Sequence, residues 1–135
     1  MNKIKILAID LGKKRIGLAV ATDDIVSGLD TLKYQNLQDA LGKLIEITKR
    51  EEAKLIIIGL PKGNETSEDQ VRSFAQNLSK LIEIPIKFVD ETLTSKEAER
   101  TLKSSKLSPR TEKYKREVDK ISAELILEQY INSIK

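Results

Sequence analysis

Two short apolar runs at the start of the chain have the length and branching of buried strands. They cover residues 4–9 and 16–21, and the polar residues between them favour a hairpin. Asp23-Asp24, Ser27-Gly28 and Asp30 indicate turns around a short third strand. We therefore expect the first 33 residues to form an antiparallel meander of three strands.

The apolar spacing then changes to that of helices alternating with strands. Residues 37–48 place apolar side chains on one helical face. The continuous apolar run at 54–61 predicts a parallel strand buried on both faces, which Pro61 ends. Ser67–Gln70 has the form of a capping box and predicts the start of a second helix, which leads to a fifth strand at 86–91.

The last third of the chain is more polar. A second capping-box pattern, Thr94–Glu97, predicts a short helix, and residues 104–115 predict a loop before a final helix over Glu117–Ile134. The order of elements predicts an α/β fold in one domain, residues 1–135. Its mixed five-stranded sheet would have three antiparallel strands followed by parallel strands, covered by helices.

Composition excludes several classes of chemistry. The chain has no cysteine and no histidine, which removes disulfides, thiolate zinc sites and nucleophile systems that depend on histidine. Any hydrolysis must use carboxylates, lysines, hydroxyls or hard metal ions. The sequence also shows no membrane span and no pattern of a signal peptide, so we expect a cytoplasmic protein that does not bind a membrane.

Charge is concentrated in one segment. Residues 96–120 carry nine basic side chains against five acidic ones, whereas the whole chain has a net charge of only +3. A run of this kind is most often a solvated helix face. Beside a catalytic groove, however, it would bind a phosphate backbone.

Acidic residues lie at the ends of three predicted elements. Asp10 ends the first strand, Asp90 and Glu91 end the fifth, and Asp119 lies on the apolar stripe of the final helix, four residues before Ala123. Each has a structural alternative: Asp10 can cap a turn, Asp119 can cap its helix, and the Asp90-Glu91 pair can stabilise a helix start. Because side chains alternate along a strand, at most one of Asp90 and Glu91 is expected to join Asp10.

Three carboxylates in one cleft would repel one another, and hard divalent cations would relieve that repulsion. Oxygen ligands alone favour Mg²⁺ or Mn²⁺. Two such ions can activate water and stabilise the leaving oxygen in phosphodiester hydrolysis. The acids therefore predict a nuclease that needs no histidine.

Four motifs in order resemble the YqgF family, also called RuvX, which has a ribonuclease-H-like (RNase H-like) fold. They are DLGKKRIG at 10–17, GLP at 59–61, DETLTS at 90–95 and DKISAELIL at 119–127. The resemblance implies a nuclease that processes the 5′ end of 16S rRNA precursor, or one that resolves Holliday junctions. It implies that Asp10, Glu91 and Asp119 form the acidic, metal-binding site. It also implies that Gly12 and Gly17 shape the hairpin and that Arg15 is a basic site residue.

This chain departs from the family pattern at two positions. Thr92 stands where arginine is usual, which removes a bidentate phosphate contact, and Ser122-Ala123 replaces a frequent pair of alanines. We expect Arg15, Lys96 and Arg100 to hold phosphates of structured RNA or branched DNA. Ribosomal precursor particles are a further expected partner.

Two other functions remain open. Asp10-Leu-Gly12 also resembles the first phosphate loop of actin-like and sugar-kinase folds, although those proteins need a second domain and a glycine-rich adenosine site. The second alternative is a nucleic-acid-binding assembly factor without activity. The chain has few aromatic side chains on which single-stranded bases could stack.

Overall fold

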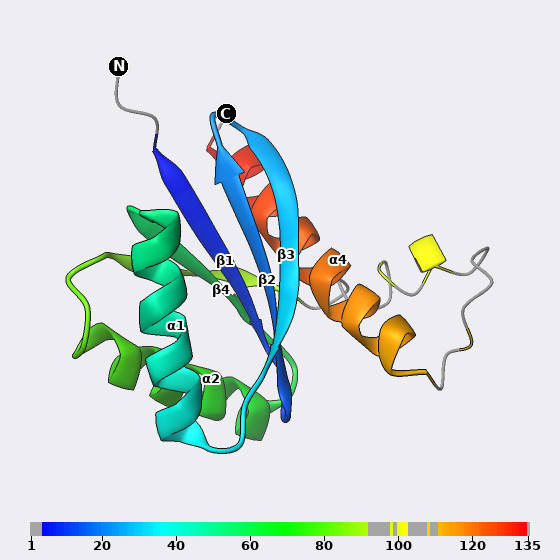
Figure 1. Ribbon diagram of the computed structural model, residues 1–135, viewed down its shortest axis with the longest axis horizontal. Coiled ribbons are helices and arrows are strands. Elements are labelled where there is room, and N and C mark those ends of the chain that lie inside the picture. Colours follow the sequence, from blue (N-terminus) through cyan, green and yellow to red (C-terminus); the bar gives the residue numbers. More distant parts are fainter. Residues whose placement is uncertain (1–3, 92–97, 99, 103–107, 109–110, 135) are drawn as a thin grey trace.

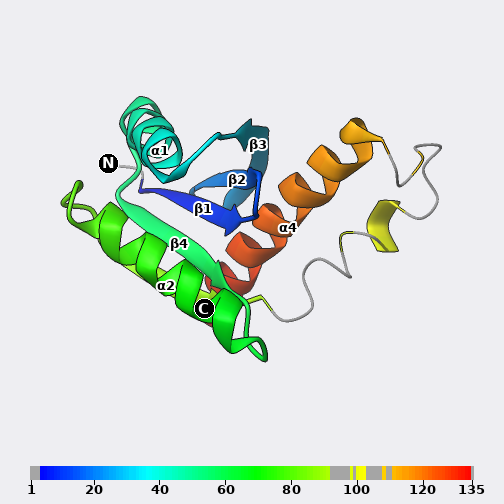
Figure 2. The same cartoon turned by 90° about the horizontal axis from the view of Figure 1, so that it is seen from below.

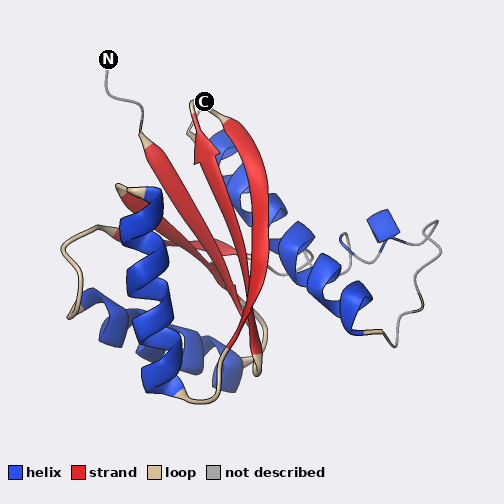
Figure 3. Cartoon of the chain, viewed as in Figure 1, coloured by secondary structure: helices blue, strands red, loops and turns tan. Residues whose placement is uncertain are grey.

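The computed structural model describes residues 4–91, 98, 100–102, 108 and 111–134. Five strands form one sheet in the order β3-β2-β1-β4-β5 (Figures 1 and 3). They are β1 (Lys5–Leu11), β2 (Arg15–Thr22), β3 (Ile25–Lys33), β4 (Leu55–Leu60) and β5 (Ile86–Asp90). The first three pair antiparallel, whereas β4 runs parallel to both β1 and β5. The predicted mixed sheet is confirmed.

Helices cover both faces of this sheet. In Figure 2, α1 (Leu37–Glu51) and α2 (Glu65–Ser79) lie on one face, and α4 (Glu112–Ser133) lies on the other. Residues 98 and 100–102 are also helical. No helix in the described part of the chain is long and apolar enough to span a membrane.

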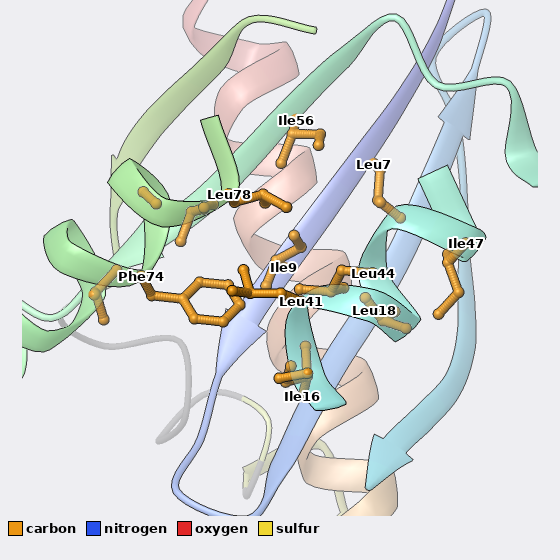
Figure 4. Packing of buried hydrophobic residues seen from close by; sticks show 14 of the residues in the cluster. Leu7, Ile9, Ile16, Leu18, Leu41, Leu44, Ile47, Ile56, Phe74 and Leu78 are labelled. Carbon is orange, nitrogen blue, oxygen red and sulfur yellow. The ribbon is translucent and has the colours of Figure 1, made fainter. Parts of the chain in front are cut away.

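Alternation along the strands produces two apolar cores. On the α1/α2 face, Leu7, Ile9 and Phe74 belong to the larger cluster (Figure 4). On the α4 face, Ala8 and Ile57 pack with residues of α4. The β4 strand contributes fully buried side chains to both clusters, which confirms the predicted burial on two sides.

Two predicted element boundaries are wrong. The third strand is not short, because Ser27, Gly28 and Asp30 lie inside β3 rather than in turns. The α2 helix begins before Ser67: the side chain of Asn64 accepts a hydrogen bond from the Ser67 amide at 3.1 Å and therefore caps the helix.

The final helix also begins earlier than predicted, at Glu112 instead of Glu117. The Thr111 hydroxyl accepts a hydrogen bond from the Tyr114 amide at 3.1 Å and caps this start. Residues 112–115, expected in a loop, are consequently helical. Asp119 lies inside α4 and is not its cap, so that alternative is excluded. The pattern at Thr94–Glu97 lies outside the described residues.

Candidate active site

Asp10 lies near the end of β1, between two glycines on the neighbouring strands. Gly17 of β2 is its pairing partner, and the pairing of Ile9 with Ile58 places Gly59 of β4 on its other side. Because Ala8 packs on the α4 face, alternation turns the Asp10 side chain toward the same face. The missing side chains of the two glycines leave room for Asp119 beside Gly17 and for Glu91 beside Gly59.

Glu91 and not Asp90 joins Asp10. Val89 packs in the α4-side core, so Glu91, two residues later, is on the same face while Asp90 is on the other. The Glu91 amide extends the ladder by donating to the Leu60 carbonyl at 3.1 Å. A Cβ on Gly59 would lie only 2.7 Å from Glu91 Oε2, so the Glu91 side chain lies over this glycine.

The carboxyl groups of Asp10 and Glu91 are hydrogen-bonded to each other. Burial raises the pKa of Asp10, and the charge of Asp119 raises it further. Burial and the adjacent Asp10 together raise the pKa of Glu91 to about 9. Without a cation, the two carboxyl groups therefore share a proton near neutral pH.

Asp119 reaches this pair because α4 packs directly against β2. A Cβ on Gly17 would lie 2.1 Å from the Asp119 carbonyl oxygen, so only glycine permits this approach. Gly17 thus allows the helix to dock, and it also lies in the hairpin, where the register of β2 with β3 shifts between Ile16 and Leu18. Gly12 shapes the hairpin, since its amide donates to the Arg15 carbonyl at 2.9 Å.

Arg15 is bound to acidic residues in this structure. Its Nε donates to Asp119 Oδ2 at 2.8 Å, and its Nη1 lies 3.5 Å from Glu112 Oε2. Sequence reasoning missed Glu112, which also lies 3.7 Å from the Lys33 ammonium group. No local motif signals this contact, because the tertiary packing of α4 against the hairpin creates it.

The donor set fits a hard divalent cation in part. Asp10 and Glu91 offer adjacent carboxylate oxygens, which Mg²⁺ and Mn²⁺ accept. Within the described ranges, however, no three acidic side chains are grouped closely enough to be a ready metal centre. The predicted triad is therefore present as a pair, with Asp119 close by and paired with Arg15.

Apart from Arg15, Arg100 is the one predicted phosphate-binding residue that the structure describes. Lys96 and Thr92 lie outside the described residues. Arg100 is exposed, and its side chain has no hydrogen bond or ion pair with the three acids in the part of the chain that the structure describes.

Comparisons with known proteins identify the family of the chain. Residues 4–133 match the family model described as "RuvX: Holliday junction resolvase". A protein of Crocosphaera subtropica named "Putative pre-16S rRNA nuclease" is 38% identical, over 98% of this chain and 95% of its own length. A Bacteroides fragilis protein of the same name is 38% identical over 96% of each chain.

Among solved structures, T. thermophilus RuvC in complex with Holliday junction substrate aligns over 96% of each chain with a TM-score of 0.55. Its sequence identity is 15%, so this likeness concerns the fold alone. RuvC has an RNase H-like fold, which confirms the predicted fold class. The family match covers nearly the whole chain, and the chain belongs to the RuvX family.

Proposed function

We propose that the protein is a divalent-metal-dependent nuclease whose substrate is the 5′ region of 16S rRNA precursor. This proposal is supported above all by the contact between Asp10 of β1 and Glu91, which follows β5, with Asp119 of α4 close to the pair. The names of the similar proteins support the substrate. A cytoplasmic location and contact with ribosomal precursor particles follow from such a substrate.

Asp10 and Glu91 would hold Mg²⁺ or Mn²⁺, with Asp119 completing the site, and two ions are expected. Bound ions would supply an activated water and neutralise charge on the phosphate. The raised pKa values mean that Asp10 and Glu91 must give up their shared proton before they can act as ligands.

Arg15 has two roles in this proposal. In the free protein its guanidinium neutralises Asp119 at 2.8 Å. A substrate phosphate offers the same planar group a bidentate partner, so Arg15 exchanges Asp119 for phosphate when substrate binds. This exchange frees the Asp119 carboxylate for the site. It also compensates in part for the arginine that Thr92 replaces.

Branched DNA is a second candidate substrate, because the family model carries the description of a Holliday junction resolvase. The same acids would serve either polymer, since phosphodiester hydrolysis requires the same charges in both. Cleavage assays with both polymers decide which of the two is the substrate.

The test incubates the purified protein with a precursor 16S rRNA fragment and with a four-way DNA junction, each with Mg²⁺ or Mn²⁺. We expect cleavage of the RNA near the mature 5′ end, and at least a hundredfold slower cleavage by Asp10→Asn and Glu91→Gln. Asp90→Asn is the matched control, because Asp90 is on the opposite face, and it should cleave at the rate of the unmodified protein. Undiminished cleavage by both site variants would overturn the proposal.

A further inference from the structure

A cavity of about 810 Å³ opens where β1 and β4 end. Leu11 and Gly12 line it after β1, Pro61 lines it after β4, and α2 forms one wall. From β1 the chain continues to β2 on one side, whereas β4 leads through α2 to β5 on the other. In open α/β sheets, ligands bind at such a reversal of strand order.

This β1–β4 cavity adjoins the acidic site, because Glu91 is part of its lining. Its walls combine apolar surface from Leu11 and Phe74 with neutral polar side chains, among them Gln70 and Asn77 of α2. Amide groups both donate and accept hydrogen bonds. Apolar walls with neutral donors and acceptors suit a nucleobase.

The charge of the lining argues against a phosphate in the same place. Lys13 is the one basic residue of this lining, against the two carboxyl groups of Asp69 and Glu91. A neighbouring hollow of about 500 Å³ has the opposite character. Its lining includes three lysines and Arg15 with a single carboxylate, that of Glu112; the lysines are Lys14, Lys33 and Lys43.

The two hollows meet at Tyr34, which lines both. The Tyr34 hydroxyl donates to the carbonyls of Gly12 and, at 2.7 Å, of Lys13, so the tip of the β1–β2 hairpin separates them. One hollow contacts the acidic site through Glu91 and the other through Arg15. A nucleic-acid strand that crosses the site therefore meets the β1–β4 cavity, which has a single basic residue, and the basic hollow.

We infer that the β1–β4 cavity takes one unpaired base of the substrate strand, while the backbone phosphates next to it lie in the basic hollow. This inference rests on the proposed function and adds a requirement to it. A base inside a duplex is stacked and paired, so it enters a cavity only from a single strand or after it has been flipped out. The protein therefore selects substrates that are unpaired next to the cleaved bond.

The test measures binding with Asp10→Asn, which is not expected to cleave, so that the RNA stays intact. Fluorescence anisotropy compares a single-stranded RNA, the same RNA in a duplex, and a set of single strands that each lack one base. Removing the base that occupies the cavity removes its contacts there, whereas the other bases have no such contacts to lose. We therefore expect one abasic position to weaken binding about tenfold, the other positions to have little effect, and the duplex to bind more weakly.

Two further variants test whether the base at the sensitive RNA position lies in the cavity. They are Gln70→Ala and Gln76→Ala, each combined with Asp10→Asn. Both glutamines are exposed on α2, but only Gln70 lines the cavity. We expect Gln70→Ala to weaken binding of the intact RNA severalfold and to reduce the effect of the abasic position. Gln76→Ala should leave both unchanged.

Equal effects at every abasic position, or equal behaviour of the two glutamine variants, would overturn the inference. Preference for the duplex would overturn it as well. In each of these cases metal-dependent cleavage by the unmodified protein would leave the proposed function intact. Absence of cleavage with every RNA and DNA substrate would instead remove the proposed function.

Discussion

The three acidic residues of the site have different environments. Asp10 and Glu91 are half-buried and lie against each other, and loss of solvent raises the pKa of both. Asp119 has the Arg15 guanidinium at 2.8 Å to balance its charge. The three acids therefore differ in what metal binding requires of them. Asp10 and Glu91 must lose a proton, whereas Asp119 must release Arg15.

The raised pKa of Glu91 predicts how stability depends on pH in the metal-free protein. Its pKa is about 9 in the folded chain and 4.5 in the unfolded one, so the folded state binds this proton more tightly. The contribution to the free energy of unfolding is therefore complete below about pH 4.5 and is lost as the pH rises to about 9. Urea unfolding with a chelator at pH 5.5, 7 and 8.5 measures this loss, and Glu91→Gln should reduce it. An unchanged pH dependence in Glu91→Gln would contradict the assignment.

Ser122 predicts an unusual gain of stability. Its side chain is fully buried in α4, and its hydroxyl has no hydrogen-bond partner within the described part of the chain. Burying such a hydroxyl costs about 1–2 kcal/mol. We expect Ser122→Ala to raise the free energy of unfolding by about this amount in urea.

Thr48→Val is the control for that experiment. Thr48 is also buried in a helix, but its hydroxyl donates to the Leu44 carbonyl at 2.7 Å. Replacing it should give no comparable gain. A loss of stability in Ser122→Ala would show that the Ser122 hydroxyl has a partner.

At the scale of elements, the close docking of α4 on β2 controls the site. A Cβ on Gly17 would overlap the backbone of Asp119, so α4 would have to move away. We expect Gly17→Ala to lower the free energy of unfolding by at least about 2 kcal/mol and to weaken metal binding by displacing Asp119. Chemical unfolding and metal titration of the same variant measure both effects.

Gly42→Ala in α1 provides the contrast, because nothing lies within 4 Å of a Cβ at that position. Alanine is favoured over glycine inside a helix, so this variant should gain about 0.5–1 kcal/mol. A Gly17→Ala protein as stable as Gly42→Ala would show that α4 does not pack as closely as described.

Most elements could be predicted from the sequence because their apolar periodicity is strong. The wrong predictions of element boundaries concern residues whose local sequence favours one structure while tertiary packing stabilises another. Gly28 indicated a turn, but in β3 it gives room to Lys120 and Glu124 of α4. Similarly, the polar start of α4 carries no apolar stripe that would have predicted a helix there.

At the scale of the whole molecule, the sheet brings together acids that lie far apart in the chain. The predicted strand ends indicated that Asp10 and the pair Asp90-Glu91 are candidate site residues. The register of the sheet then shows that Glu91, and not Asp90, lies on the same face as Asp10. The pairing of Asp119 with Arg15 could not be predicted, because it depends on how α4 crosses the sheet (Figure 2). Family motifs identified these residues, and the packing shows which of them are in contact.

The most direct test of the account is calorimetric titration of Mn²⁺ into the unmodified protein, Asp10→Asn, Glu91→Gln and Asp90→Asn. We predict binding to the unmodified protein and to Asp90→Asn with the same affinity. In Asp10→Asn and Glu91→Gln the affinity should be at least tenfold weaker, because each loses an anionic ligand. Full affinity in both of these variants, or a loss confined to Asp90→Asn, would contradict the claim that Asp10 and Glu91 form the centre of the site.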